Sequence, residues 1–587
     1  MKYEITGNWK NGYKNDAVLF FAQSIEKLLN PNTDHVNRLP VLNSYSLLYE
    51  YMKTFDLVEN ELIDKKHLEF ISEELFDALE HDLIIDRILS KEQLSSINKK
   101  FNSIKNEEKR TVILYLINQL YKFNETAKDY ILEMLRNTKN KNEIFLGLRS
   151  YLSYLIGGGY SEDFIFNFCK IKFNNNKNVS MNTVEDFLSR FDFVNQKFTV
   201  ILPVNIEIKQ FQKILEKRLP LSFSINKKSL GRFIYDSDKY VLISLPIEAL
   251  DLNQASILAM NRLALFTRYY KFFSQSTIPF FGKSCIVIDE DSGERSFVKI
   301  RKNGLVNLLQ EKEVPKLQLG EIAEGVITSL LSAEDNVFSI IDKAIINFNN
   351  ARENKDLNSS FLNFWSVLES LCEQKDVAKI SQIEQNILPI LSKDYITMIF
   401  EDLIKDITDN VAKENLVTFY NKNFGKSLIN DLDFMCLILL DEYNNARTEL
   451  YSLLSEFPFI RYKIFNINKR YENHGSIQKD IVRFENRLKW HLRRLYRARN
   501  TIIHSGETPE HLQYLTKHLM EYTSQLLGEI IFNLTIREDI SNVESLFIDI
   551  ELFNSNLKAY LLKEPKNHIS KEDIVYLISY KEPTNAN

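Results

Sequence analysis

Two residues that could act on a phosphodiester, Arg499 and His504, stand five positions apart. An arginine guanidinium binds two phosphate oxygens at once and stays charged, and a histidine can give or take a proton near neutral pH. RNA needs no metal for cleavage, because its 2′-hydroxyl is a nucleophile already placed beside the phosphorus. The protein then has to transfer protons, which is typically worth about 10²–10⁴-fold, and to stabilise charge on the phosphoryl oxygens.

The run that contains this pair is Arg499-Asn500-Thr501-Ile502-Ile503-His504-Ser505-Gly506. On a helix, Asn500 and His504 share a face and Arg499 is offset to its side. A histidine in the last turn meets unsatisfied carbonyls and the negative end of the helix dipole, which favour its protonated form. One histidine per chain leaves the second proton transfer unserved, whereas a two-fold dimer would supply both an acid and a base. We therefore expect a homodimer or a higher even oligomer.

A helix from Ile477 to His504 is predicted to position the pair, because this stretch contains no Pro or Gly and is rich in Arg, Leu and Lys. Ser476 is the expected N-cap, and Ser505-Gly506 is expected to supply the C-cap. Pro509 should then open the next helix, since Pro is favoured in a first helical turn.

The predicted helix is strongly cationic. Between positions 483 and 499 its basic residues are Arg483, Arg487, Lys489, Arg493, Arg494, Arg497 and Arg499, opposed only by Glu485. We predict that RNA phosphates are bound by Arg483, Arg487, Arg493, Arg494 and Arg497. Two plainer interpretations stay open. An arginine-rich helix is usually a solvated face, and a histidine before a helix end often only satisfies the end carbonyls.

The pattern Arg499-Asn500-x-x-x-His504 resembles the R-x4-6-H signature of the HEPN superfamily, in its R-x4-H form. Upstream, the run from Trp365 to Leu371 is similar to the W-x-x-L-E-x-L first helix of Apea-like HEPN domains. The resemblance covers roughly residues 320–540, and only these two short runs are specific.

The resemblance implies a helical bundle that dimerises and cleaves RNA without a metal, often in phage defence or in toxin–antitoxin pairs. It makes Arg499 and His504 the catalytic pair and Asn500 their supporting polar residue. It also suggests Glu369 as a helper that orients Arg499. Because Glu369 flanks an apolar stripe that includes Trp365, a partly buried ion pair explains it equally well.

Composition favours a mainly α protein of several parts. Gly and Pro number only 16 and 12 in 587 residues, well below the usual Gly share of about 7%. A chain this long exceeds a single core. We predict a helical N-terminal domain at 1–195, a small α/β (α+β) module at 196–315, a HEPN-like helical nuclease domain at 316–545 and a helical tail at 546–587.

Hydrophobic periodicity predicts the elements of each part. N-terminal helices are expected near 17–29, 42–57, 60–80, 107–121, 125–137, 142–156 and 181–190. Segments rich in β-branched and aromatic residues predict strands at 197–204, 240–245 and 285–288. A hairpin is expected to join 284–289 to 295–301, and a helix is expected near 251–274, between the strands. C-terminal helices are expected near 321–350, 358–374, 389–406, 409–421, 428–456, 477–504 and 509–535, with one or two short helices in the tail.

Three ligand-binding patterns are present only in part. Gly157-Gly158-Gly159 follows a predicted helix, so a helix–helix turn is a better interpretation than a phosphate loop. The stretch from Asp289 to Gly293 begins like a calcium loop, but its twelfth position is Ile300, which cannot bind calcium. Gly425-Lys426-Ser427 lacks the earlier Gly and the preceding strand of a nucleotide-binding loop.

Basic and aromatic residues alternate between Phe457 and Asn473, so this segment could stack on single-stranded RNA. A loop tucked over the bundle through its aromatic rings fits the same residues.

The four cysteines show no CxxC spacing, which indicates buried thiols in a reducing compartment. The start of the chain lacks a signal-peptide core, and the longest apolar run, 434–440, is too short to span a bilayer. We expect a cytoplasmic protein without metal, cofactor or membrane contact.

The preferred hypothesis is a metal-independent endoribonuclease that leaves 2′,3′-cyclic phosphate and 5′-hydroxyl ends on single-stranded RNA or tRNA. Its setting would be anti-phage abortive infection or toxin-like defence, with residues 1–315 sensing a trigger such as a phage component. The alternative is a non-catalytic scaffold that binds RNA or protein through helix 477–504. A metal-dependent nuclease ranks third, because no clustered Asp, Glu and His set has ligand spacing.

Overall fold

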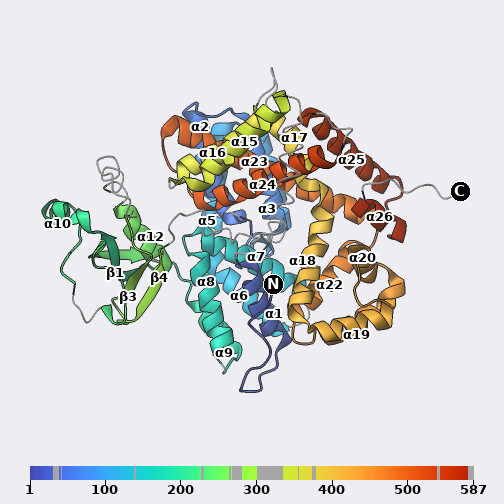
Figure 1. Cartoon of the computed structure of the whole chain (residues 1–587), viewed down its shortest axis with the longest axis horizontal. Helices are drawn as coiled ribbons and strands as arrows, with labels where there is room; N and C mark the ends of the chain where they lie inside the picture. The colour runs from blue at the N-terminus through green and yellow to red at the C-terminus, as the bar shows by residue number, and fades with distance from the viewer. Residues whose placement is uncertain are drawn as a thin grey trace.

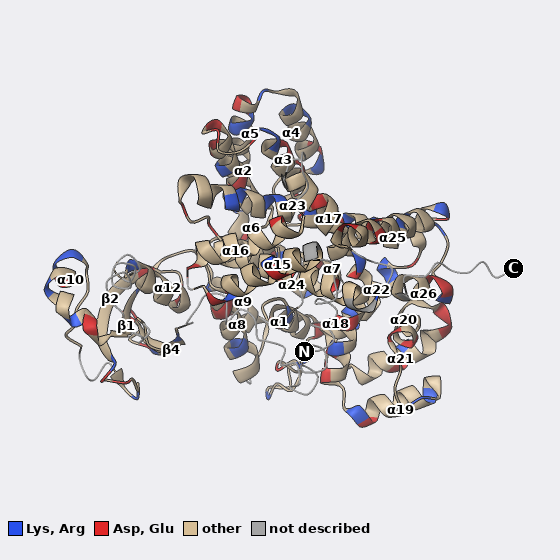
Figure 2. Ribbon diagram, turned by 45° about the horizontal axis from the view of Figure 1, so that its top comes forward, with Lys and Arg blue, Asp and Glu red and all other residues tan. Residues whose placement is uncertain are grey.

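The computed structural model is mainly α-helical with one small antiparallel sheet, which confirms the predicted fold class (Figure 1). It describes residues 1–30, 33, 39–40, 42–137, 140–176, 178–225, 230–263, 266, 280–300, 335–354, 356–372, 379–537 and 542–579. The sheet and its two helices lie to one side of a large helical body, and Figure 2 shows the same separation from a second direction.

The N-terminal part is a succession of helices, as the periodicity predicts. They are α1 (Asp16–Leu28), α2 (Ser44–Glu59), α3 (Lys66–His81), α4 (Lys91–Ser103), α5 (Asn106–Gln119), α6 (Phe123–Asn137), α7 (Lys141–Gly157), α8 (Glu162–Lys170) and α9 (Met181–Ser189). Helices α4 and α8 were not predicted. In α4 only Leu94 and Phe101 are buried. Two apolar positions are too few to show the 3.6-residue periodicity by which a helix is predicted.

The middle module is a four-stranded sheet in the order β2-β1-β3-β4, with every neighbouring pair antiparallel. Its strands are β1 (Gln196–Asn205), β2 (Tyr240–Ala249), β3 (Ser284–Asp289) and β4 (Arg295–Lys299), with helices α10 (Gln212–Arg218) and α12 (Leu252–Arg262). The predicted hairpin is confirmed as β3–β4, and Gly293 takes a positive φ of 70° at its tip. The predicted helix 251–274 is α12 up to Arg262, and most of the remainder lies outside the described residues.

The C-terminal helices are α15 (Asp335–Glu353), α16 (Leu357–Leu371), α17 (Lys379–Lys393), α18 (Tyr395–Asn410), α19 (Lys413–Phe424), α20 (Asp431–Leu439), α21 (Asn444–Leu453), α22 (Pro458–Arg470), α23 (His474–Ser505), α24 (Leu512–Ile536), α25 (Val543–Lys563) and α26 (Lys571–Ser579). The helix predicted at 428–456 is wrong as a single element, because Leu440 is extended and divides α20 from α21. The tail helix α25 spans 21 residues and is therefore not short.

The N-terminal and C-terminal helices share one hydrophobic core, which includes residues from Tyr3 to Phe191 and from Val337 to Leu577. Helix α1 packs on α22, and α3 packs on α23. The sheet module has a core of its own on the face that α12 covers. The described parts of 1–195, 316–545 and 546–587 therefore form one helical body, whereas length alone had suggested separate domains.

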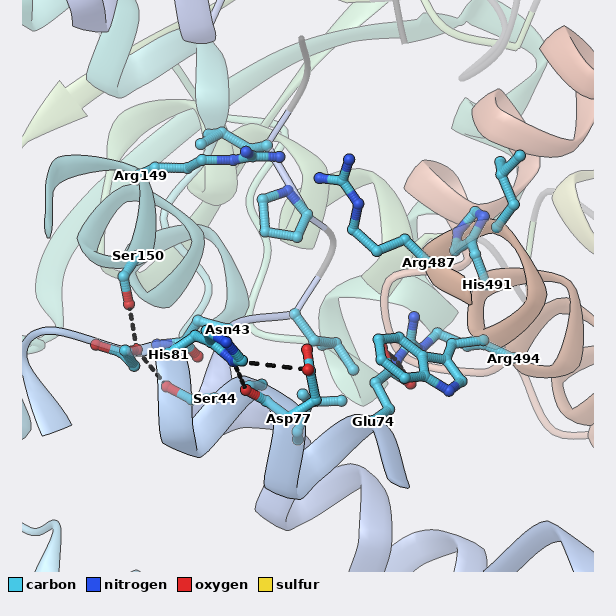
Figure 3. Close-up of a pocket in the computed structure, with 18 of the residues that line it drawn as sticks. Asn43, Ser44, Glu74, Asp77, His81, Arg149, Ser150, Arg487, His491 and Arg494 are labelled. Carbon is cyan, nitrogen blue, oxygen red and sulfur yellow. Dashed lines mark hydrogen bonds and ion pairs between the residues drawn. The ribbon is translucent and has the colours of Figure 1, made fainter. Parts of the chain in front are cut away.

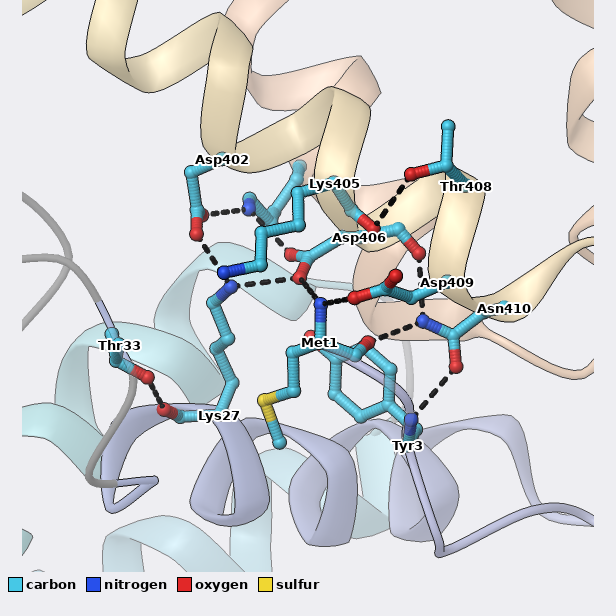
Figure 4. Close-up of polar contacts among 11 residues, drawn as sticks. Met1, Tyr3, Lys27, Thr33, Asp402, Lys405, Asp406, Thr408, Asp409 and Asn410 are labelled. Atoms are coloured by element: carbon cyan, nitrogen blue, oxygen red, sulfur yellow. Dashed lines mark hydrogen bonds and ion pairs between the residues drawn. The ribbon is translucent and has the colours of Figure 1, made fainter. Parts of the chain in front are cut away.

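A buried network of four charged side chains joins the N-terminal helix α1 to the helices α18 and α22 of the C-terminal part (Figure 4). Lys27 of α1 lies 2.7 Å from Asp402 and 2.8 Å from Asp406, both on α18. Lys463 of α22 contacts the same two carboxylates at 2.6 and 2.7 Å. Burial opposes the charged form of Asp402, but the charges of Lys463 and Lys27 outweigh it and lower the pKa of this carboxyl. Every charge is compensated, so the network fixes α1 against α18 and α22.

Candidate active site

Helix α23 runs through the helical body and contacts α3, α16, α17, α18, α24 and α25. It begins at His474, three residues earlier than predicted, because Asn473 is the N-cap and Ser476 closes a capping box with it. Gly475 lies in the first turn, where a Cβ would stand 2.9 Å from the carbonyl oxygen of Pro565. Only glycine permits this approach between α23 and the segment that follows α25.

The C-terminal end of α23 agrees with the sequence prediction, since Gly506 takes the left-handed conformation with φ of 69° and caps the carbonyl of Ile502. The predicted role of Pro509 is wrong. Helix α24 begins at Leu512, and its N-cap His511 is itself left-handed, with φ of 58°. The motif residues therefore occupy the last two turns of α23 and are followed by a loop.

Arg499 is held by residues of two helices. Its Nη2 lies 3.5 Å from Oε1 of Glu369 on α16, and its Nη1 donates to Oδ1 of Asn500 over 3.2 Å. The same carboxylate oxygen of Glu369 accepts a hydrogen bond of 3.0 Å from Nε1 of Trp365. Trp365 is buried, so it fixes Glu369, and Glu369 in turn orients Arg499. The structure thus brings together the predicted Arg499, Asn500 and Glu369.

Arg499 keeps donors to spare. Its side chain is 20% exposed, and that of Glu369 is 25% exposed, so both reach the surface. The two contacts of Arg499 use one N–H of each terminal nitrogen out of five N–H groups in a guanidinium. Its buried Nε has no hydrogen-bond partner among the described residues. A phosphate oxygen could bind the remaining N–H groups of the two terminal nitrogens without breaking the existing contacts.

His504 is exposed on the last turn of α23, one turn after Asn500. Within the described part of the chain its ring accepts and donates no hydrogen bond, so the imidazole is available for proton transfer. Asn500 is buried beneath it and supports Arg499. The arrangement offers an exposed imidazole and a partly exposed guanidinium near the same helix end.

Three of the five arginines predicted to bind RNA are buried in ion pairs, and for these the prediction is wrong. Arg493 lies 2.6 Å from Glu384 of α17, Arg494 lies 2.7 Å from Glu74 of α3, and Arg497 lies 2.9 Å from Glu50 of α2. Their exposures are 6%, 6% and 3%.

Neighbouring helices neutralise these three charges. Although burial opposes it, the charges of Arg497 and Arg494 lower the pKa of Glu50. Arg493 also lies over the ring of Phe70, with its central carbon 3.3 Å from the ring centroid. In Figure 2 acidic and basic residues are interspersed over the helices. These three guanidinium groups are therefore paired in the interior and do not form a row of exposed charges on the surface of α23.

The other two predicted RNA-binding residues differ from these three. Arg483 is exposed, two turns after the start of α23, and its contact with RNA stays a prediction. Arg487 is half-buried and lies beside the ring of Phe484, with 5.8 Å between its central carbon and the ring centroid. It lines a cavity far from the motif.

A second histidine lies close to the motif and was missed by the sequence argument. A cavity of about 550 Å³ beside the end of α23 is lined by Thr501 and Ser505 together with His511. Burial lowers the pKa of His511. The sequence signal for His511 was its position seven residues after His504, behind the glycine that caps α23. The left-handed backbone of His511 could not be predicted from the sequence.

The weaker motifs have structural roles. Gly425 is the left-handed C-cap of α19, and the glycines from 157 to 159 form the turn between α7 and α8. The segment from Phe457 to Asn473 is mostly helix α22 and not a loop. Its rings Phe459 and Tyr462 are buried, which agrees with the interpretation that the segment packs on the bundle through its aromatic side chains. All four cysteines are buried and unpaired by disulfides, as predicted.

Across the part of the chain that the structure describes, no group of three His, Cys, Asp or Glu side chains is placed to hold a metal ion. Within the same residues, no helix combines the length and the apolar character needed to cross a bilayer. Comparison with known protein families, curated proteins and solved structures finds no match to this chain. The argument for function therefore depends on the residues themselves.

Proposed function

We propose that this protein is a metal-independent endoribonuclease of the HEPN type, with Arg499 and His504 as its catalytic pair. One observation carries the proposal. The two short runs that resemble HEPN domains are 130 residues apart in the chain, and they meet where Glu369 contacts Arg499. Chance resemblance in two separate runs gives no reason for such a contact, whereas a shared catalytic site does.

In the proposed reaction, the 2′-hydroxyl oxygen of RNA attacks the adjacent phosphorus and the bond from phosphorus to the 5′-oxygen breaks. A base takes the proton of the 2′-hydroxyl, and an acid gives a proton to the leaving 5′-oxygen. His504 serves as one of these groups, and His504 of a second copy serves as the other. Arg499 binds the phosphoryl oxygens with the N–H groups that Glu369 and Asn500 leave unused.

The substrate is proposed to be single-stranded RNA or tRNA, and the active form a homodimer or a higher even oligomer. The proposed setting is the cytoplasm, in defence of a cell against phage or as a toxin. Helices α2 and α3 hold α23 through buried ion pairs, so a trigger that moves them would also move the catalytic helix. This is the proposed route by which a phage-derived signal acts.

The scaffold alternative loses its main support. It required the middle of α23 to offer a row of arginines to phosphates, and Arg493, Arg494 and Arg497 are instead paired with carboxylates in the interior. An exposed His504, available for proton transfer, has no role in such a scaffold.

Cleavage of total RNA by the purified chain, with and without EDTA, tests the proposal. We expect cleavage in both conditions, with 2′,3′-cyclic phosphate and 5′-hydroxyl ends. His504→Ala and Arg499→Ala should each reduce the rate by about 10²-fold or more, because they remove proton transfer and charge stabilisation.

The matched control is His568→Ala, which removes an exposed histidine on the segment between α25 and α26. It should cleave as the unaltered chain does. If the variants at positions 499 and 504 retain full activity, or if cleavage requires a divalent metal, the proposed function is wrong.

A further inference from the structure

A second cavity, of about 330 Å³, lies between the N-terminal helices and the first half of α23 (Figure 3). Its size falls within the range of pockets that bind small molecules. Its charged and titratable lining includes Arg149, Arg487, Arg494, His81, His491 and His518. Its lining extends along α23 as far as Arg494 but includes neither Arg499 nor His504, so this cavity is separate from the catalytic pair.

Two guanidinium groups approach the same space in this cavity. Figure 3 shows Arg149 of α7 and Arg487 of α23 turned toward one another, with Glu74 and Asp77 on the opposite side. Burial and the neighbouring charge of Arg487 lower the pKa of Arg149 to about 10. Two arginine side chains, a residue type that carries a positive charge at neutral pH, therefore face the same part of the cavity.

The acids of the cavity are engaged elsewhere. Glu74 binds Arg494 through both of its oxygens at 2.7 Å. Asp82 accepts hydrogen bonds from Ser44 and Ser150. Asp77 lies 3.6 Å from the ring of His81.

Arg487 is left without an acidic partner. No carboxylate of the described chain is within ion-pair distance of it, and its buried Nε has no hydrogen-bond partner there. A buried donor without a partner costs about 1–3 kcal/mol, and more when it is charged. An anion between α7 and α23 would remove this cost.

The rest of the lining is apolar and aromatic. It includes Leu42, Leu47, Leu83, Leu146, Phe484 and Leu488. Trp490 and Tyr522 add two larger rings to the same cavity. A ligand that suits both walls carries an anionic group at one end and a flat or apolar body at the other.

We propose that this cavity binds a phosphate-bearing small molecule of about the size of a mononucleotide, with its phosphate between Arg149 and Arg487 and its body against the apolar wall. The ligand bridges the N-terminal helix α7 and the catalytic helix α23. This inference does not rest on the proposed nuclease activity, because binding is measured without RNA.

Calorimetric titration and thermal unfolding of the full chain test it with adenosine 5′-monophosphate, guanosine 5′-monophosphate, inorganic phosphate and adenosine. At least one nucleotide should bind and raise the unfolding temperature, because ligand binding to the folded state stabilises it. Adenosine should bind at least about tenfold more weakly, since it cannot form the charge-assisted hydrogen bonds. The absence of binding by both nucleotides, or equal binding of adenosine, overturns the proposal.

Arg487→Gln should weaken nucleotide binding at least about tenfold, whereas the control Lys479→Gln, on the exposed face of the same helix, should leave it unchanged. Unchanged binding by Arg487→Gln contradicts the assignment. If Arg487→Gln does not fold, chemical modification of the unaltered chain still tests the proposal. A nucleotide should protect Arg487, and not Arg483, from modification by phenylglyoxal, and equal modification with and without nucleotide overturns the proposal.

Discussion

The middle and the end of helix α23 place the same residue type in opposite environments. In the middle, Arg493, Arg494 and Arg497 lie 2.6 to 2.9 Å from carboxylates of three other helices. At the end, Arg499 lies 3.5 Å from Glu369 and remains partly exposed. The short, buried pairs join helices to one another. The longer, exposed contact leaves the guanidinium oriented and able to bind an anion.

This difference separates arginines that stabilise the fold from one that can act on a substrate. A guanidinium enclosed with a carboxylate has exchanged its hydration for a fixed partner, and removing one member leaves a buried charge behind. Arg499 has kept part of its exposure, and its terminal nitrogens keep N–H groups that its two contacts do not use. Orientation by Glu369 restricts its motion before substrate arrives, which is what a site for phosphoryl oxygens requires.

The largest expected effect comes from breaking a pair in the middle of α23. Arg494→Ala should lower the free energy of unfolding by about 3–5 kcal/mol, because Glu74, whose side chain is only 15% exposed, would lose its partner. Chemical denaturation followed by circular dichroism measures this change. His504→Ala should change the same quantity by less than about 0.5 kcal/mol, since its side chain is exposed. A loss below about 1 kcal/mol for Arg494→Ala would show that the pair does not hold α3 on α23.

The second prediction concerns pH and depends on two buried histidines, His491 of α23 and His67 of α3. Burial and the charges of Arg494 and Arg497 lower the pKa of His491 to about 3. Burial and the charge of Arg497 likewise lower the pKa of His67, on α3, to about 4. Both therefore stay neutral in the folded state down to a pH at which the unfolded chain is already protonated.

Between about pH 6.5 and these lowered values the unfolded state binds more protons than the folded state, so stability falls as pH falls. From pH 6.5 to 5 the loss should reach at most about 2 kcal/mol for each histidine. Denaturation at several pH values measures the slope. His491→Gln should reduce it, and the exposed control His568→Gln should not. Equal stability at pH 5 and pH 7 would contradict the prediction.

The sequence predicted many of the helical segments and the place of Arg499, Asn500 and His504 on α23, because periodicity and capping are local properties. It missed α4, α8, α22 and most of α17. It did not predict the burial of the other arginines. Their partners Glu50 and Glu74 lie 447 and 420 residues away from Arg497 and Arg494 in the chain. No local pattern contains that information. In the sequence, a cationic run looks the same whether it faces solvent or pairs with carboxylates of three other helices.

The contact between Glu369 and Arg499 was expected only through the resemblance to HEPN domains, since no spacing connects positions 130 residues apart. The break at Leu440 and the shared core of the two helical parts were missed for a similar reason. Both depend on how helices pack after they form, and the apolar run around Leu440 gave no turn signal.

The smallest expected effect tests the role of Glu369 at the end of α23. Glu369→Gln keeps an oxygen that can accept the hydrogen bond of Trp365 Nε1, but it loses the charge that orients Arg499. We expect kcat for RNA cleavage to fall about tenfold, equivalent to about 1.4 kcal/mol, with a smaller change in KM. The free energy of unfolding should change by less than about 1 kcal/mol, because the contact is partly exposed.

Ser366→Ala on the same helix is the matched control, since its hydroxyl donates only to the backbone carbonyl of Leu362. A variant Glu369→Gln that unfolds more easily yet cleaves at the normal rate would make Glu369 a packing residue. A variant that keeps its stability and loses kcat would make it a positioning residue. The second outcome requires that Arg499 acts on the transition state, because an arginine that only bound RNA would change KM instead.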